Sequence, residues 1–227
     1  VSIPSLTGVQ QHTRESLVKE VKELQSLGVP GIILFGIPEQ KDPLGSEAWN
    51  PDGIVHLALQ DCRDVVGEDM VLIADLCIDE YTDHGHCGTI VDNDVHNDLT
   101  LETLSMQALT LAKAGADVLA PSDMMDGRVQ SIRNKLDSSG FEKIPVFPYS
   151  VKYASAFYGP FRDAVGSGPK KGDRKSYQMS FKNSKEYFRE VEQDLTEGAD
   201  AIIIKLSLIH ISEPTRLLSM GVGGVGV

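Results

Sequence analysis

Helices that end at a glycine and lead into a short, uninterrupted apolar segment are the feature that most restricts the fold of this chain. Thr13 is expected to begin one such helix and Gly28 to end it, Thr100 and Gly115 bound another, and a third ends at Gly198. The apolar segments are expected to be strands, at 31–35, 70–76, 117–120, 144–149 and 199–204. They lack the alternation of half-buried strands, which predicts strands covered on both faces. Strands that alternate with helices predict a parallel sheet, either a closed barrel or a doubly wound sheet.

Polar residues after the strands decide between these two arrangements. No glycine-rich phosphate loop follows any strand, which disfavours a doubly wound nucleotide-binding sheet. Polar clusters follow four of the strands instead, at 75–79, 122–126, 150–153 and 205. In a barrel this is the catalytic face. We therefore predict an α/β fold, a (β/α)8 TIM barrel, of which this chain holds about five of the eight strands.

The charge balance limits the class of partner. Acidic residues outnumber basic ones 33 to 21, which gives a formal net charge of −12. Such a chain lacks the basic field that nucleic acids and anionic membranes attract, and its apolar runs are too short to span a bilayer. Nothing near the first residue resembles a signal peptide. The three cysteines, an odd number, favour free thiols in a reducing cytoplasm.

Two lysines lie where parallel strands are expected to end. Lys205 follows the run Ala-Ile-Ile-Ile, and Lys152 follows the strand that ends at Tyr149. Burial at a barrel mouth and a second lysine nearby both lower the pKa of an amine and free it to attack a carbonyl as a Schiff-base nucleophile. The structural alternative is a lysine that merely extends to solvent from a strand end.

The segment DLCIDEYTDHGHCG, residues 75–88, gathers potential metal ligands. Cys77, Asp79, His84, His86 and Cys87 offer thiolate, carboxylate and imidazole groups. Two soft sulfur ligands favour zinc over magnesium. The alternative is a pair of buried free cysteines beside a polar loop.

Residues 159–178 are expected to form a basic, glycine-containing loop. It carries Arg162 and Arg174. One interpretation is a solvated surface loop, and the other is a lid whose arginines bind a substrate carboxylate in the fork of the guanidinium group.

Long motifs relate the chain to a known family. The runs YSVKYASAFYGPFRDAVGSG (149–168) and APSDMMDGRV (120–129), with the segment that holds the two cysteines, resemble porphobilinogen synthase, also called δ-aminolevulinic acid dehydratase. The resemblance covers residues 1–205. It implies a TIM barrel with an N-terminal arm, a homo-octamer, and a hydro-lyase that condenses two 5-aminolevulinic acid molecules to porphobilinogen in tetrapyrrole (haem) biosynthesis.

The resemblance also implies roles for individual residues. Lys205 matches the Schiff-base lysine and Lys152 its partner. The positions that match substrate-binding residues are Arg162, Arg174 and Gln178 in the lid, and Asp75, Ser122 and Asp123 along the site.

The implied metal sites differ from the family pattern at one position. Cys77 and Cys87 match two of the three cysteines that hold zinc, but Asp79 stands at the middle position, so a mixed thiolate and carboxylate site is expected. His86 is assigned a supporting role beside these ligands. Glu190 matches a glutamate that binds an allosteric magnesium ion in many bacterial members.

The two ends of the chain depart from the family. Residues 206–216, LSLIHISEPTR, resemble the translation of a sequencing adapter. We therefore expect residues 1–205 to be a partial catalytic barrel that lacks its first strand and its last two, residues 206–227 to be a non-native tail, and the chain by itself to be inactive. The alternatives are a class I aldolase-like Schiff-base barrel and a non-catalytic metal-binding or assembly module.

Overall fold

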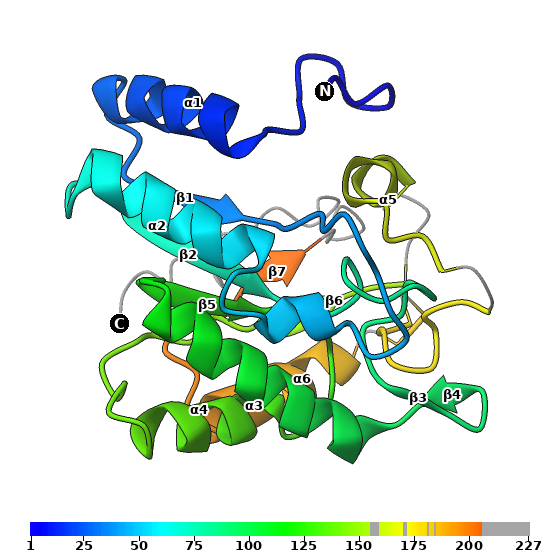
Figure 1. Ribbon diagram of the computed structural model, residues 1–227. Coiled ribbons are helices and arrows are strands. Elements are labelled where there is room, and N and C mark those ends of the chain that lie inside the picture. Colours follow the sequence, from blue (N-terminus) through cyan, green and yellow to red (C-terminus); the bar gives the residue numbers. More distant parts are fainter. Residues whose placement is uncertain (155–158, 170–171, 181, 184, 206–227) are drawn as a thin grey trace.

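The computed structural model describes residues 1–154, 159–169, 172–180, 182–183 and 185–205. The helices are α1 (Arg14–Ser26), η1 (Ser46–Trp49, a 3-10 turn), α2 (Ile54–Val66), α3 (Asn97–Lys113), α4 (Arg128–Asp137), α5 (Gly159–Val165) and α6 (Glu186–Thr196). The strands are β1 (Gly31–Leu34), β2 (Val71–Leu76), β3 (Ile90–Val91), β4 (Asp94–Val95), β5 (Val118–Pro121), β6 (Val151–Lys152) and β7 (Ile204–Lys205). In the view of Figure 1, helices α1 and α2 lie above the strands, and α3, α4 and α6 lie below them.

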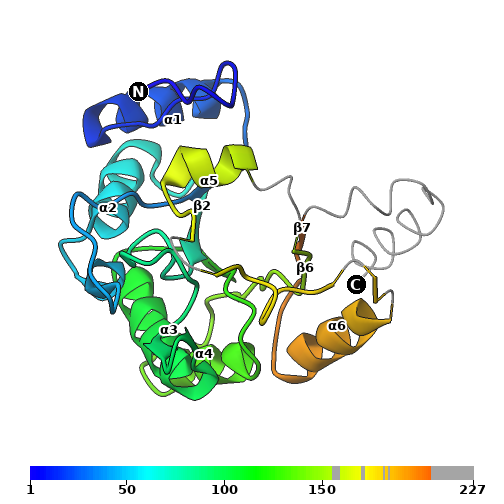
Figure 2. The ribbon, with the colours of Figure 1, turned by 90° about the vertical axis from the view of Figure 1, so that its right-hand side faces the viewer.

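The strands follow one another across an open parallel sheet. β1 pairs with β2 and β2 with β5, both in parallel. The segment 144–149 comes next, because the Phe147 amide donates to the Leu119 carbonyl at 2.8 Å. Beyond it, β6 pairs with β7, again in parallel. The helices surround the strands as an arc (Figure 2). The α/β class and the parallel order are thus confirmed, while the described residues form no closed barrel.

The fourth predicted strand occupies its expected place but is irregular. It contains Pro145 and Pro148, which have no amide hydrogen to donate to a ladder. Their carbonyls still accept, from Leu119 at 3.0 Å and from Ile203 at 2.8 Å. The segment 144–149 therefore remains hydrogen-bonded within the sheet, but its two prolines prevent it from forming a continuous strand.

The predicted helix ends are correct for α1 and partly wrong for α3. Thr13 caps α1 by accepting a hydrogen bond from the Ser16 amide, and Gly28 follows it with a φ of +79°. α3 begins at Asn97, not Thr100, because the His96 ring accepts a hydrogen bond from the Leu99 amide at 3.3 Å. Part of the expected basic loop is also helical, since it contains α5.

One continuous core joins the sheet to the helices that surround it. It includes Leu59 of α2, Leu72 of β2, Leu104 of α3 and Ile132 of α4, each with no exposed surface. Burial of each such side chain contributes roughly 1.5–3 kcal/mol. This core fixes β1, β2 and β5, and with them the residues at the ends of these strands. Val151 of β6 and Ile204 of β7 pack in a second, smaller cluster. Among the described residues, no helix combines the length and the apolar character needed to cross a membrane, and residues 206–227 lie outside the described part of the chain.

His56 makes the stability of this core depend on pH. Its ring is buried between α2 and α3, and Nε2 lies 2.9 Å from the Thr110 hydroxyl. Burial lowers the pKa of His56 from 6.5 to about 4. Between pH 6.5 and 4 the unfolded chain therefore binds a proton at His56 more readily than the folded chain does. The contribution of the neutral ring to the free energy of unfolding is complete above pH 6.5. We expect this contribution, up to about 3 kcal/mol, to be lost as the pH falls towards 4.

Chemical unfolding at several pH values tests this expectation. His56→Gln removes the titrating ring, so the variant should lose less stability than the native chain over this interval. His12→Gln, on the exposed N-terminal segment, serves as the control. Equal pH dependence in the native chain and His56→Gln would contradict the assignment.

Candidate active site

Four polar residues that the sequence placed after different strands meet at one edge of the sheet. Asp75 lies in β2, Ser122 directly follows β5, Lys152 ends β6, and Lys205 ends β7. The Ser122 hydroxyl donates to the Asp75 carboxylate at 3.1 Å, and the Lys152 ammonium donates to the Ser122 carbonyl. Lys152 and Lys205 are direct partners in the β6–β7 register. The carboxyl ends of the strands therefore bring two lysines and a carboxyl group into one buried cluster.

The Lys205 amine lies in an aromatic environment. Its Nζ is 4.0 Å from the centre of the Phe161 ring, 5.0 Å from that of Tyr149 and 5.8 Å from that of Phe35. Ring faces favour an ammonium ion, but burial and the charge of Lys152 act in the opposite direction and lower the pKa of Lys205 overall. The amine is therefore neutral more often at pH 7 than an exposed lysine.

The pKa of Asp75 is raised, as expected of a proton donor. Burial raises the pKa of its carboxyl, although Lys205, Lys152 and the Ser122 hydroxyl partly offset this effect. One of its oxygens accepts from Ser122, and the other is buried without a partner among the described residues. A carboxyl that keeps its proton near neutral pH can protonate a leaving oxygen beside Lys205.

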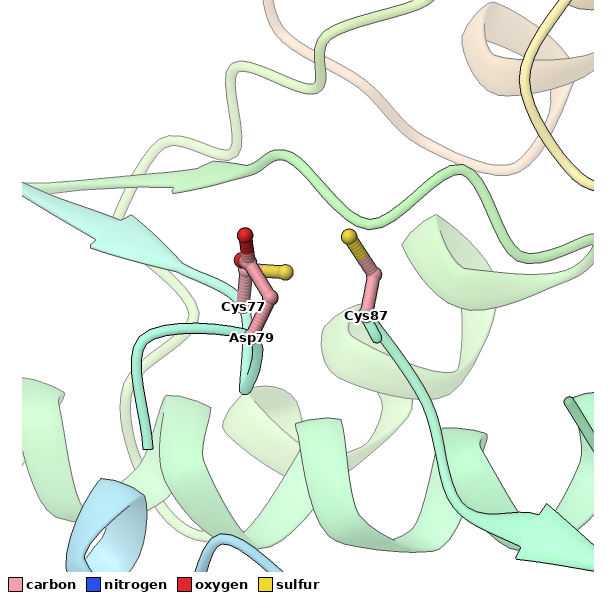
Figure 3. Close-up of side chains that lie close together, drawn as sticks. All are labelled: Cys77, Asp79 and Cys87. Carbon is pink, nitrogen blue, oxygen red and sulfur yellow. The ribbon is translucent and has the colours of Figure 1, made fainter. Parts of the chain in front are cut away.

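Cys77, Asp79 and Cys87 form a compact group of potential metal ligands. All three are buried, and their ligand atoms lie within 4.8 Å of one another. Cys77 and Asp79 belong to the stretch that follows β2, while Cys87 comes from the returning part of the loop (Figure 3). Burial raises the pKa of Cys77, whereas the hydrogen bond from Cys77 lowers that of Cys87. The pair can therefore present a thiolate at Cys87.

Arg174 ties the predicted lid to this group. Its guanidinium donates to the Asp79 carboxylate at 2.8 Å, to the Gly85 carbonyl at 2.8 Å and to the Ser167 carbonyl at 2.5 Å. Burial alone would raise the pKa of Asp79, but the charges of Arg174 and Lys152 outweigh it and hold that pKa below its usual range. The lid and the cysteine loop are thus joined by a buried ion pair that the sequence did not predict.

Breaking this ion pair should destabilise the fold. Asp79→Asn leaves the Arg174 charge buried without its counter-ion, and both side chains are only 4% exposed. Loss of one partner of such a pair costs about 3–5 kcal/mol, and we expect a loss on this order in chemical unfolding with a chelator present. The exposed pair of Asp173 with Lys175 supplies the control, because Asp173→Asn should cause no measurable change. Equal losses from the two variants would contradict this role for Asp79.

The other predicted residues lie in different surroundings. Gln178 is 5% exposed, and neither polar atom of its amide has a hydrogen-bond partner among the described residues. Glu190, on α6, lines a pocket with Asp126 and Glu186, where burial and the Asp126 charge raise its pKa. Arg162 belongs to α5, but its side chain lies outside the described part of the structure.

His86 contacts the metal-ligand group through a tyrosine. Its Nδ1 lies 3.1 Å from the Tyr177 hydroxyl, which accepts a hydrogen bond from the Cys87 amide at 3.4 Å. This arrangement suits the supporting role predicted for His86, which remains a prediction.

Two buried groups beside the site were absent from the sequence prediction. Glu80 follows Asp79 and is 2% exposed, and burial raises the pKa of its carboxyl well above the usual value. Arg128 is also 2% exposed and pairs with Asp194 of α6 at 3.0 Å. Neither residue carries a local signal, because a glutamate or an arginine next to a turn normally faces solvent.

Comparisons with known proteins relate the chain to one family. The family model described as "Delta-aminolevulinic acid dehydratase" matches residues 1–212, and so extends past Lys205, the expected end of the resemblance. A protein of that name from Halalkalibacterium halodurans is 50% identical over 209 residues, covering 92% of this chain and 63% of the relative. The Bacillus subtilis protein of that name is 49% identical over 210 residues, covering 92% and 64%.

A solved structure extends the comparison to the fold. Delta-aminolevulinic acid dehydratase from Toxoplasma gondii, in complex with the reaction product porphobilinogen, matches with a TM-score of 0.87 and 44% identity. The match covers 90% of this chain and 59% of that one. The chain thus spans a little under two thirds of the length of these three proteins.

Proposed function

Because this chain belongs to the delta-aminolevulinic acid dehydratase family, we propose that it supplies the Schiff-base site of a porphobilinogen synthase. Its reaction is the condensation of two 5-aminolevulinic acid molecules to porphobilinogen with loss of two waters. The observation that supports this most directly is the register of Lys152 and Lys205 at the ends of adjacent parallel strands. The fold we propose for the whole protein is a (β/α)8 barrel, with these residues on its catalytic face.

The side chains suggest how the first covalent step proceeds. The neutral Lys205 amine attacks the substrate ketone, so that a carbon–nitrogen bond forms, the carbon–oxygen π bond breaks, and the ketone oxygen takes up the proton that the amine nitrogen loses. This oxygen then leaves as water after a second proton arrives from Asp75 or Lys152, and the nitrogen lone pair completes the imine. The low pKa of Lys205 and the raised pKa of Asp75 suit these opposite roles.

The lid residues are proposed to hold the substrate carboxylate. Arg162, Arg174 and Gln178 carry donors suited to carboxylate oxygens. The side-chain amide of Gln178 and the Nε of Arg174 have no hydrogen-bond partner among the described residues, which supports this assignment. Ser122 and Asp123, at the end of β5, are proposed to line the same site.

The donor set of Cys77, Asp79 and Cys87 fits zinc better than magnesium. Two sulfurs and one carboxylate oxygen can surround a single ion, and soft thiolates select zinc. When bound, the ion would supply Lewis-acid and positioning chemistry to the second substrate. The pairing of Asp79 with Arg174 makes the two cysteines the principal ligands. We further propose that Glu190 holds an allosteric magnesium ion, on the basis of its family match and its acidic pocket.

Family membership also supports a homo-octamer and a cytoplasmic location, both of which are proposals here. Size measurements by light scattering and localisation of a tagged chain in cells would test them separately.

Reductive trapping with borohydride distinguishes the proposed function from the two alternatives, an aldolase-like barrel and a non-catalytic module. We expect borohydride with 5-aminolevulinic acid to leave a stable adduct on the peptide that contains Lys205, and pyruvate to leave none. An adduct with pyruvate alone would favour an aldolase-like barrel. No adduct with either ketone would favour a non-catalytic metal-binding or assembly module.

A further inference from the structure

Arg128 connects three parts of the molecule from a fully buried position. It is the first residue of α4, and its side chain is 2% exposed. Its guanidinium donates to the Met125 carbonyl at 3.1 Å, to the Tyr149 carbonyl at 3.3 Å and to the Asp194 carboxylate at 3.0 Å. These acceptors lie in the turn after β5, in the segment before β6 and in α6. A lysine could not reproduce this set of contacts, since it lacks the planar fork.

The turn after β5 needs such support because its backbone is strained. Met124 has a φ of +77°, a conformation that a bulky residue rarely adopts. Residues in this region persist only where their surroundings hold them. Asp123 accepts a hydrogen bond from the Met125 amide at 2.7 Å, and Arg128 approaches Asp123 to 3.8 Å. Arg128 therefore holds both sides of the strained residue.

The same turn and segment hold Lys152. The carbonyl of Ser122, at the start of the turn, accepts from the Lys152 ammonium, and the segment fixed through Tyr149 leads directly into β6. Lys152 in turn pairs in register with Lys205. We propose that Arg128 is a positioning residue that fixes Lys152 beside Lys205 by holding the turn after β5 and the segment before β6. The catalytic meaning of this role rests on the proposed function of the two lysines.

A second arginine of α4 provides a matched control. Arg133 also donates to two carbonyls, those of Ile144 and Phe141, at 2.7 and 3.1 Å. These acceptors lie at the start of the 144–149 segment and just before it, at the opposite end from Tyr149. Arg133 also pairs with Asp137 at 2.8 Å and approaches Asp200 to 4.0 Å. Arg128→Lys and Arg133→Lys therefore remove comparable contacts from the same helix, but only the first is expected to displace Lys152, because within the described part of the chain Arg133 makes no hydrogen bond or ion pair with the turn after β5.

The test measures the reactivity of Lys205 directly. The chain is acetylated with acetic anhydride over a range of pH values, and the peptides that contain Lys205 and the exposed Lys113 are compared by mass spectrometry. The titratable groups that act most strongly on Lys205 are Lys152, Asp75, Asp79 and Glu80, and Arg128 is not among them. A change in Lys205 on substitution of Arg128 therefore reports a displaced Lys152.

We expect Arg128→Lys to raise the pH midpoint for Lys205 by about one unit, which lowers its acetylation at pH 7 about tenfold relative to Lys113. Arg133→Lys should leave the midpoint unchanged. Adding Met124→Gly to Arg128→Lys should restore much of the reactivity, because glycine adopts a positive φ without strain. If Arg128→Lys does not fold by circular dichroism, Asp194→Asn takes its place, with a smaller shift in the same direction.

An unchanged midpoint in the folded Arg128 or Asp194 variant would overturn the proposal, as would an equal shift in Arg133→Lys. Borohydride trapping of the native chain with 5-aminolevulinic acid is run beside these measurements. Absence of that adduct would count against the proposed function alone, since acetylation of Lys205 requires no substrate.

Discussion

Lys205→Met is expected to abolish the adduct that borohydride traps from 5-aminolevulinic acid. Lys205 is the half-buried lysine whose pKa is lowered by burial and by the charge of Lys152, and methionine retains similar bulk without a nucleophile. The adduct on this chain should fall to the level seen when the ketone is omitted. Peptide mapping by mass spectrometry makes the measurement.

Two further variants distinguish the lysine that forms the adduct from the lysine beside it. Lys152→Met should slow trapping without moving the adduct, because it removes the nearby charge that lowers the pKa of Lys205 but leaves the amine in place. Lys113→Met, at the exposed end of α3, should trap as well as the native chain. An adduct that persists in Lys205→Met at the position of Lys152 would reverse the assignment of the two lysines.

Cys87→Ser is expected to weaken zinc binding more than about 100-fold, since the loss of even an outer partner of a metal ligand commonly costs about 10–100-fold. Cys87 is the thiol whose pKa is lowered, mainly by the hydrogen bond from Cys77, so it supplies the more available thiolate. Competition with a chromophoric chelator gives the dissociation constants. Because zinc displaces protons from the thiols, binding should also weaken as the pH falls.

Cys62 supplies the control for this measurement. It is buried in α2 and stands outside the compact group of potential ligands. Cys62→Ala should therefore leave zinc affinity unchanged. If Cys87→Ser binds zinc as tightly as the native chain, the ligands lie elsewhere.

The apolar pattern predicted the ends of β1, β2 and β5 to within one residue, but the strand expected at 199–204 is only β7, Ile204–Lys205, and β6 was not predicted. The apolar runs mark strands covered by helices, and the polar residues after them, such as Asp75 and Ser122, meet at one edge as a parallel sheet requires. The start of α3 was wrong because histidine is an uncommon cap, so His96 gave no signal. The segment 144–149 is irregular because its two prolines cannot donate hydrogen bonds to a neighbouring strand, although its apolar pattern is that of a buried strand.

Contacts between distant residues were the part that the sequence could not reveal. Asp79 and Arg174 are 95 positions apart, and their ion pair depends on how the lid packs on the cysteine loop. Arg128 and Asp194 are 66 positions apart, and they form an ion pair because the fold brings the start of α4 next to α6. A spacing rule cannot anticipate such pairs, since each side chain by itself is typical of a solvated surface.

The short pairing of β6 with β7 limits how this region can change during evolution. In the described part of the chain two residue pairs define it, and one of them is the lysine pair. Side chains alternate between the two faces of a strand, so the gain or loss of a single residue in either approach to the pair would turn one amine to the opposite face. A substitution in these stretches changes packing by a small amount, whereas the insertion of one residue places the two lysines on opposite faces. We therefore expect selection to act on the length of the segments 145–151 and 199–204 more strictly than on the identity of most residues in them.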